Sequence, residues 1–600
     1  MRIGIDAGGT FTDFVIAHDD GRVETFKIRS NPAAPARVIL AGLARVGAKA
    51  RTDVVHGSTV ATNALLERKG ARVALVTTAG FEDVIQIGRQ NRERLYDLNP
   101  PLRRGLVSRE MCFGVAERAY FDGTIAARPS AVELERLKTR LSRAGVEAVA
   151  VCFLHAYRNA ENEAAVLDVL RSLGVYVCAS HEICPEFREY ERTSTTLLNA
   201  YVGPLMDRYL AEVEQGTTCR ISIMQSNGGL LTAAEARRQA VRTLLSGPAG
   251  GVVGAIEIAR LSGFEKVLSF DMGGTSTDVS LSEGRAGMSM EASVDGFPVR
   301  VPMLDIHTVG AGGGSIARVD DGGLLRVGPE SAGAFPGPAC YGLGELATVT
   351  DAHVVLGRIT SLLGGAMTLD AARAATAVDA VAARLGLSRT KTAEGILRVA
   401  NANMERAIRV VSVERGHDPR EFALVAFGGC GGLHACEMAE DLGIRTVVVP
   451  RFAGVLSAMG MLMADRVRDY AAGVLGREDI EESYRALEKW ARRDLRGAKL
   501  VRSVDVRYVG QSYELNVGDV SEFHGAHERV YGYADRGRAL ELVTVRVTAV
   551  KPVKRLQIGS GPKKKPVAGP ALLADYGSTT YVPGGWNART DKVGNLVITR

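Results

Sequence analysis

The sequence has few cysteines and no long apolar run, and both absences narrow the class of protein. Its eight cysteines in 600 residues form no Cys-x-x-Cys pair, which argues against a disulfide framework. No stretch of about 18 apolar residues occurs, so no transmembrane helix is expected. The sequence starts within a strand-like run, Arg2 to Ile5, which leaves no room for a signal peptide. We therefore expect a cytoplasmic protein with free thiols.

Several ligand signatures are also missing. The net charge is only +6, from 74 basic and 68 acidic side chains, so a nucleic-acid or membrane surface is not indicated. No Gly-Lys dipeptide occurs, which excludes a Walker A loop. The run Gly310 to Ser315 matches a dinucleotide-binding fingerprint only in part, because the third glycine and the acidic partner are absent. Cys430, His434 and Cys436 have no common zinc spacing.

The residues that are present predict an α/β fold. Short runs rich in β-branched residues alternate with helical patterns, which is typical of largely parallel sheets. The clearest strand-like runs are residues 72–77, 146–154, 266–270, 423–427 and 446–449. Between Thr392 and Gly416, apolar residues recur at helical spacing, and Pro419 follows as a stop signal.

An internal repeat is the most informative feature of the sequence. Asp6-Ala-Gly-Gly-Thr-Phe-Thr-Asp13 recurs as Asp271-Met-Gly-Gly-Thr-Ser-Thr-Asp278, about 265 residues later. Each copy follows one apolar run and precedes another, so a strand, a glycine turn and a second strand occur twice. Repetition of a whole unit indicates duplicated lobes. We expect lobes at residues 1–190 and 191–466, followed by a smaller α+β domain at residues 467–600.

The repeated turns suggest phosphate binding. Glycine leaves backbone N–H groups uncovered, and such groups can cradle phosphate oxygens. Two facing turns would grip a triphosphate, with Asp6 and Asp271 holding Mg²⁺. A single turn of this kind is often only a tight hairpin; two matched copies favour a site. The candidate phosphate-binding residues are Gly8, Gly9, Thr10, Thr12, Gly273, Gly274, Thr275 and Thr277.

Two further glycine clusters precede helices. Gly428 and Gly429 follow a strand and lead into a helix from Leu433 to Leu442, so they are candidates to face an adenosine. A close contact between helix and strand is the alternative. The run Ser246 to Gly251 also leads into a helix, where it would act as an anion site or a simple cap.

Together these motifs resemble the hydantoinase/oxoprolinase family, specifically its A-type, ATP-binding subunit, over nearly the whole chain. Other motifs that carry the resemblance are His56-Gly-Ser-Thr-Val-Ala-Thr-Asn63, Leu66–Gly70, Gly88-Arg-Gln-Asn91, Arg188–Ser194, Ser226–Gly229, Ser246–Ala249, Gly310–Ile316, Arg507–Gln511 and Tyr531–Tyr533. One position departs from the family pattern, because Gly432 stands where a proline is common.

The resemblance implies two duplicated ribonuclease-H-like lobes of the actin/Hsp70/sugar-kinase superfamily. It also implies that ATP, with Mg²⁺, phosphorylates a carbonyl or enolate oxygen of a cyclic amide for hydrolysis. Cyclic amides in the family include hydantoins, 5-oxoproline and lactams. A separate B-type subunit commonly assists, so a hetero-oligomer is expected. The candidate catalytic residues are Asp13, Asp271, Asp278, His56 and His307, although a lone histidine is more often structural.

Three alternatives stay open. A ketone carboxylase subunit would activate a ketone in place of an amide. A small-molecule kinase of the sugar-kinase type would release a stable phosphorylated product. A non-catalytic ATP switch, like a chaperone or filament protein, would hydrolyse ATP slowly and ignore cyclic amides.

Overall fold

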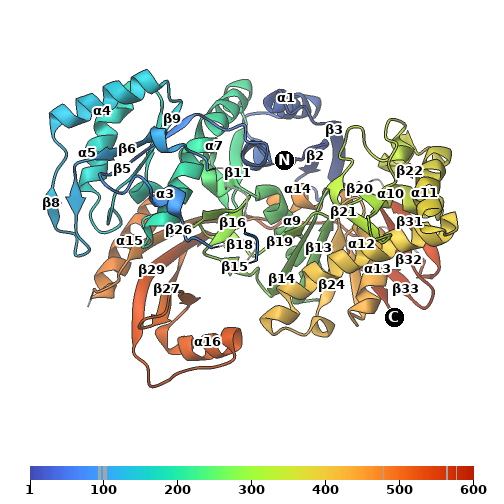
Figure 1. The fold of residues 1–600 in the computed structure, drawn as a ribbon. Helices are drawn as coiled ribbons and strands as arrows, with labels where there is room; N and C mark the ends of the chain where they lie inside the picture. Colours follow the sequence, from blue (N-terminus) through green and yellow to red (C-terminus); the bar gives the residue numbers. More distant parts are fainter. Residues whose placement is uncertain (92–95, 99–104, 478, 562–564, 576) are drawn as a thin grey trace.

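A computed structural model describes residues 1–91, 96–98, 105–477, 479–561, 565–575 and 577–600. The chain forms two large sheets, and each sheet contains one copy of the sequence repeat as a hairpin (Figure 1). β1 and β2 are the first copy, and β13 and β14 are the second. The alternation of buried apolar side chains along β1, such as Ile3 and Ile5 at 0% exposure, is what sets each hairpin into its core.

The repeat extends well beyond the hairpins. Five strands of each sheet have the same order and the same pairings: two successive antiparallel pairings on one side of the first strand and two successive parallel pairings on the other. In the first sheet these are β3 (Val23–Arg29), β2 (Phe11–Ala17), β1 (Arg2–Ala7), β4 (Asp53–Ser58) and β11 (Arg220–Met224). In the second they are β19 (His307–Val309), β14 (Thr277–Glu283), β13 (Lys266–Met272), β24 (Ala423–Phe427) and β25 (Thr446–Val449). The predicted duplication of ribonuclease-H-like lobes is confirmed.

Each large sheet contains strands from more than one of the domains expected from the sequence. The first sheet continues through β12 (Leu230–Thr232), β26 (Arg466–Gly473), β29 (Leu540–Lys551), β27 (Lys499–Tyr508) and β28 (Leu515–Val517). The second sheet is completed by β34 (Leu596–Thr599), β33 (Asn587–Thr590) and β30 (Val567–Ala568). Strands of the expected third domain, residues 467–600, are therefore divided between both lobes. Sequence composition could not reveal this, because strand pairing is non-local.

A third, parallel sheet projects from the first lobe. It consists of β10 (Tyr176–Ala179), β9 (Ala148–Cys152), β5 (Val73–Thr78) and β6 (Cys112–Val115), and α4 (Ala131–Ala144) and α5 (Glu161–Leu170) lie beside it (Figure 1). The long helix α7 (Glu189–Gly216) packs against β9 and against α1 (Pro35–Arg45), so it ties this part to the first sheet.

Two helices cross between the large sheets. α9 (Ser246–Leu261) contacts β13, and α14 (Leu456–Met461) contacts β1. They approach closely because glycines face each other: a Cβ on Gly460 would lie 2.0 Å from the carbonyl oxygen of Gly250. One buried apolar cluster joins Val15 and Val55 of the first sheet to the second lobe. The lobes thus share a continuous core beneath the hairpins.

Helix predictions were largely confirmed. α12 (Arg389–Val411) begins after the cap Ser388 and buries Ile396, Ala400 and Met404 on one face, as the spacing indicated. α13 (Gly431–Asp441) follows β24. All eight cysteines are free thiols. Within the described residues, no helix combines the length and apolarity needed to cross a membrane.

Candidate functional site

The two glycine turns have equivalent geometry. Asp6 lies opposite Asp13 in the pairing of β1 with β2, and Asp271 lies opposite Asp278 in the pairing of β13 with β14. In the first turn the N–H of Gly8 donates to Phe11 O at 3.1 Å, and in the second the N–H of Gly273 donates to Ser276 O at 3.0 Å. Gly9 and Gly274 stand at the tips, where an added Cβ would meet no atom within 4 Å. Both tips are therefore open to a ligand.

Both turns face one cavity of about 1030 Å³. Of the residues predicted from the sequence, those that line it are Asp6, Thr10, Asp13, Asp271, Gly273, Gly274, Thr275, Gly428 and Gly429. The predicted convergence of the hairpins is thus what the structure contains. We call this space the central cavity.

Carboxyl groups gather on the floor of the central cavity. Burial raises the pKa of Asp271 well above its ordinary value, and the charges of Asp278, Asp6 and Asp13 raise it further. Burial, followed by the charge of Asp13, raises the pKa of Asp6 to about 7. One oxygen of Asp6, Oδ1, is buried and finds no hydrogen-bond partner among the described residues. Repulsion between these carboxylates is unfavourable unless a bound cation neutralises it.

Asp13 and Asp278, which lie opposite Asp6 and Asp271 in their hairpins, have different partners. We call them the outer pair, and Asp6 and Asp271 the inner pair. Lys27 Nζ donates to both oxygens of Asp13, at 2.7 and 2.8 Å, and to Gly454 O at 2.7 Å. Thr308 Oγ1 donates to Asp278 Oδ1 at 2.5 Å. Burial raises the pKa of Asp278 to about 6, and it is not among the residues lining the cavity. Sequence reasoning missed Lys27 and Thr308, because neither belongs to the repeat.

The other glycine clusters support the second turn. Gly428 has φ of 79°, and a Cβ there would lie 2.4 Å from Met272 O, so only glycine suits this close approach. In the loop Gly310–Ser315, the N–H groups of Gly313 and Gly314 donate to Gly273 O at 3.1 Å and Gly274 O at 2.7 Å. The loop with the partial dinucleotide fingerprint therefore holds the second glycine turn in place through backbone hydrogen bonds.

Several predicted residues lie outside the cavity lining. Thr12 is 2% exposed and hydrogen-bonds Ser30 Oγ at 3.0 Å, and Thr277 is 0% exposed and donates to Ala311 O at 2.6 Å. Gly8 and Gly9 are also absent from the lining. The threonines at the strand starts therefore fix the turns from behind and do not present hydroxyls to a ligand.

Neither predicted histidine reaches the central cavity. His56 is 1% exposed, and its Nδ1 lies 3.2 Å from Ile5 O while its Nε2 bonds the hydroxyl of Tyr209. Burial lowers its pKa to about 4, which keeps the ring neutral. His307 lies opposite Val279 at the edge of the second sheet. These contacts favour a structural hydrogen-bonding role for His56, and His307 precedes Thr308, which bonds Asp278. A catalytic role for either histidine stays a prediction.

The rest of the lining is mixed, with polar side chains such as Arg29 and His353, and much of its apolar part comes from loops that the sequence analysis did not identify. Residues 333–343 and 359–367 supply Phe335, Leu343, Ile359 and Met367. Among the described residues, no three His, Cys, Asp or Glu side chains are grouped so as to hold a metal ion unaided. The cavity therefore pairs an acidic floor beside two open glycine turns with an apolar wall, which suits a polyphosphate ester with a flat base.

The duplicated lobes, the shared helix crossing and the cleft between the glycine turns define the chain as a member of the actin/Hsp70/sugar-kinase class of folds. Within that class, family models for the hydantoinase/oxoprolinase N-terminal region and for hydantoinase/oxoprolinase match residues 2–174 and 192–470. The chain belongs to the hydantoinase/oxoprolinase family.

Three relatives illustrate the match. The caprolactamase subunit alpha of Pseudomonas jessenii is 35% identical over 98% of this chain and 92% of its own. The crystal structure of ATP-dependent caprolactamase from that organism superposes with a TM-score of 0.88, at 32% identity, over 100% of both chains. The nucleotide-free structure of acetone carboxylase superposes with a TM-score of 0.79 at 25% identity, over 100% of this chain and 99% of its own. The chain spans 52% of 5-oxoprolinase 1 of Arabidopsis thaliana, at 33% identity.

Proposed function

We propose that this chain is the ATP-binding subunit of an enzyme that activates a cyclic amide for hydrolysis. ATP phosphorylates the amide oxygen, and the activated amide is then hydrolysed to the ring-opened amino acid. The observation that carries the proposal is the meeting of both glycine turns, with their aspartates, in one cavity. The relatives named caprolactamase and 5-oxoprolinase support the choice of a cyclic amide.

The residues present fit a triphosphate with Mg²⁺. The open tips at Gly9 and Gly274 leave room for phosphate oxygens, and N–H groups of both turns would bind them. Asp6, with its orphaned Oδ1, and Asp271 would hold Mg²⁺ directly or through water. One or two carboxylates are enough, because phosphates and water complete the magnesium shell. When bound, Mg²⁺ neutralises charge that develops on the transferred phosphoryl group.

Asp13 and Lys27 would act as a pair. The ammonium group of Lys27 neutralises Asp13 and is itself fixed to Gly454 O, so it lies at the cavity wall with a defined direction. A fixed cation at this place would stabilise the negative charge on the phosphoryl group while it is transferred. Asp271 and Asp278 would orient the group that attacks, and Thr308 would hold Asp278 in place. The wall formed by Phe335, Leu343 and Ile359 would exclude water from the base.

A ketone carboxylase subunit is the second candidate. The superposition on acetone carboxylase favours it, as does 36% identity over 78% of this chain to the acetophenone carboxylase gamma subunit of Aromatoleum aromaticum. Relatives named as alpha and gamma subunits support a requirement for a partner, for which we propose a B-type hydantoinase/oxoprolinase subunit.

The test is phosphate release from ATP by the purified chain, with and without a B-type subunit co-purified from the host. The substrates are a panel of lactams, hydantoins, 5-oxoproline and simple ketones, the ketones with bicarbonate. We expect cyclic amides to stimulate ATP turnover and to be converted to amino acids. Stimulation by ketones alone would assign the carboxylase function, and turnover that no carbonyl compound changes would refute both.

A further inference from the structure

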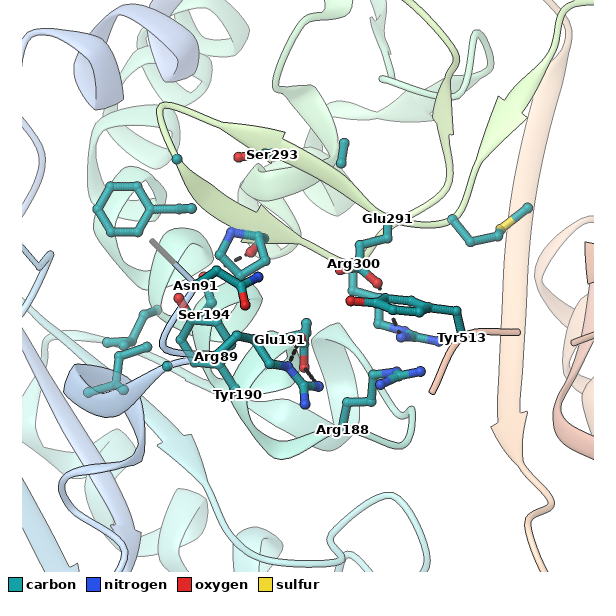
Figure 2. A pocket seen from close by; sticks show the side chains of 18 of the residues that line it. Arg89, Asn91, Arg188, Tyr190, Glu191, Ser194, Glu291, Ser293, Arg300 and Tyr513 are labelled. Atoms are coloured by element: carbon teal, nitrogen blue, oxygen red, sulfur yellow. Dashed lines mark hydrogen bonds and ion pairs between the residues drawn. The ribbon is translucent and has the colours of Figure 1, made fainter. Parts of the chain in front are cut away.

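A second cavity, of about 1300 Å³, lies outside the nucleotide site proposed above. Among the described residues it has no lining residue in common with the central cavity. Four parts of the chain build it: residues 85–91 with 105–109, the start of α7, residues 288–300, and residues 505–531. Figure 2 shows this space, which we call the lateral cavity. It contains the family motifs Gly88–Asn91 and Arg188–Ser194, to which the nucleotide site gives no role.

One wall of the lateral cavity is joined through the chain to two strands of the second sheet, one of which carries Asp278. Residues 288–300 belong to the excursion between β14 and β19, which are paired strands of the second sheet. β14 carries Asp278, β19 carries Thr308, and those two side chains are hydrogen-bonded. A ligand bound to this wall therefore contacts the segment that joins the strand of Asp278 to the strand of Thr308.

Most charges around the lateral cavity are already matched. Arg89 donates through Nε and Nη2 to the two oxygens of Glu191, each at 2.7 Å. Arg188 donates to Glu514 at 2.7 Å, and Arg300 donates to Glu186 at 2.9 Å and also to Glu514. These pairs fix the walls and leave no net charge that would demand a strongly charged ligand.

Hydrogen-bond donors remain at the start of α7. The side chain of Arg188 is only 8% exposed, yet its Nε is buried without a partner among the described residues. Its φ of 92° is unusual for a residue other than glycine and holds it at the helix entrance. It does not cap the helix, so the first N–H groups of a 28-residue helix are also free of an intrahelical partner. This end of the cavity suits a carbonyl or carboxylate oxygen.

An acceptor remains on another wall. The carboxylate of Glu291 is 40% exposed and lies 3.6 Å from Arg300 Nη1, beyond a good hydrogen bond. It accepts no hydrogen bond from any residue in the described part of the chain. Burial raises its pKa, the charge of Arg300 opposes that rise, and the charges of Glu191 and Glu514 add to it. Figure 2 shows Glu291, Arg300 and Tyr513 grouped apart from Arg89, Glu191 and Tyr190. Glu291 suits an amide N–H or an ammonium group.

We propose that the lateral cavity binds the organic reactant, a small molecule that places a nitrogen donor on Glu291 and an oxygen acceptor at Arg188 and the start of α7. A cyclic amide and the amino acid made by opening its ring both have this chemistry. Ile85, Leu106 and Phe297 supply apolar surface for the intervening methylene groups. The choice of reactant rests on the proposed function. Because the cavities are separate, this site holds the reactant apart from phosphoryl transfer.

Titration calorimetry on the full chain, without nucleotide, tests the site. The probes are five- to seven-membered lactams and 5-oxoproline, the amino acids that result from their opening, and matched alkyl carboxylates and alkyl amines. We expect at least one lactam or amino acid to bind, and its single-ended analogues to bind about tenfold more weakly or worse, because each buried charged hydrogen bond contributes about that factor. The ring form or the open form that binds identifies the species held.

The variant Glu291→Gln removes the negative charge and one of the two acceptor oxygens, breaks no hydrogen bond and alters only the 3.6 Å contact with Arg300. Glu212→Gln, at an exposed glutamate on α7 that lines neither cavity, is the charge-matched control. We expect the dissociation constant of the bound probe to rise about tenfold in the first variant and to be unchanged in the control. Binding of a non-hydrolysable ATP analogue at its own site should survive Glu291→Gln. Equal affinities in wild type and Glu291→Gln, or no binding by any probe, would overturn the proposal.

The two proposals fail separately. If cyclic amides stimulate ATP turnover but Glu291→Gln binds them as the wild type does, the lateral site is refuted and the function stands. If no amide stimulates turnover but the probes bind through Glu291, the site stands and the function is refuted.

Discussion

The two hairpins have the same backbone but different surroundings. At the first, Asp13 lines the central cavity and is held by the ammonium group of Lys27. At the second, Asp278 lies off the cavity and is held by the hydroxyl of Thr308. The two hairpins therefore share the glycine turn and the inner pair, Asp6 and Asp271. They differ in the partners of the outer pair, Asp13 and Asp278. We infer that the inner pair acts symmetrically on a cation and the outer pair does not.

Asp271→Asn should have the largest effect. Its carboxyl, whose pKa is kept high by burial and by the three neighbouring acids Asp278, Asp6 and Asp13, is the one we place on Mg²⁺ and beside the attacked group. The amide retains the shape but loses the charge, so ATP turnover should fall by about a thousandfold or more. Phosphate release measures this.

The exposed aspartate Asp321, changed to Asn, is the control and should retain full turnover. Thermal melting should show both variants folded. A folded Asp271→Asn variant with wild-type turnover would remove the basis for treating the inner pair as the cation site.

Lys27→Met and Thr308→Val test the divergence of the outer pair directly. Loss of Lys27 leaves Asp13 buried without its cation and withdraws a positive charge from the cavity wall, so turnover should fall about 10- to 100-fold. Loss of the Thr308 hydroxyl removes one hydrogen bond from a carboxyl off the cavity, and turnover should fall less than about tenfold. Steady-state kinetics on both variants compares them. Equal losses would mean that the outer aspartates still have equivalent roles.

Asp6→Asn should separate stability from function. The pKa of Asp6 is about 7 in the fold and 3.8 ordinarily, so the folded state binds the proton more tightly than the unfolded chain. Its contribution to stability is therefore full below about pH 4 and is lost as pH rises through 7. At pH 8 the variant should be more stable than the wild type by about 1–3 kcal/mol, because no charge has to be buried.

At pH 4 that gain should vanish, and urea denaturation at the two pH values measures it. Mg²⁺-dependent nucleotide binding should be lost in the variant, and in the wild type it should weaken as pH falls below 7, since protonation of Asp6 competes with the cation. A stability gain that is equal at both pH values would contradict the assigned pKa shift.

The sequence was sufficient for the parts of the site that repeat. Identical residues around Asp6 and Asp271 predicted both the duplicated lobes and the meeting of their turns, because a repeated local motif requires a repeated local structure. Lys27 and Thr308 could not be found in this way, since each reaches its aspartate only through strand pairing. The sequence could not separate a catalytic from a structural role for His56, because a polar residue inside a family motif is consistent with both. Its burial and its contact with Tyr209 favour the structural role.

Long-range pairing also explains why the sequence could not show how the strands of residues 466–600 are distributed. Nothing in the composition of these residues indicates that β34 pairs with β25 of the second lobe, or that β26 extends the first sheet. The lateral cavity likewise depends on four segments spread between residues 85 and 531, so only the fold reveals it.

The most direct measurement is a crystal structure of the chain with Mg²⁺ and a non-hydrolysable ATP analogue. We predict that phosphate oxygens lie within hydrogen-bonding distance of N–H groups in both turns, Gly8–Thr10 and Gly273–Thr275, with the cation at Asp6 and Asp271. Nucleotide density at another place, or phosphates that contact only one turn, would contradict the account.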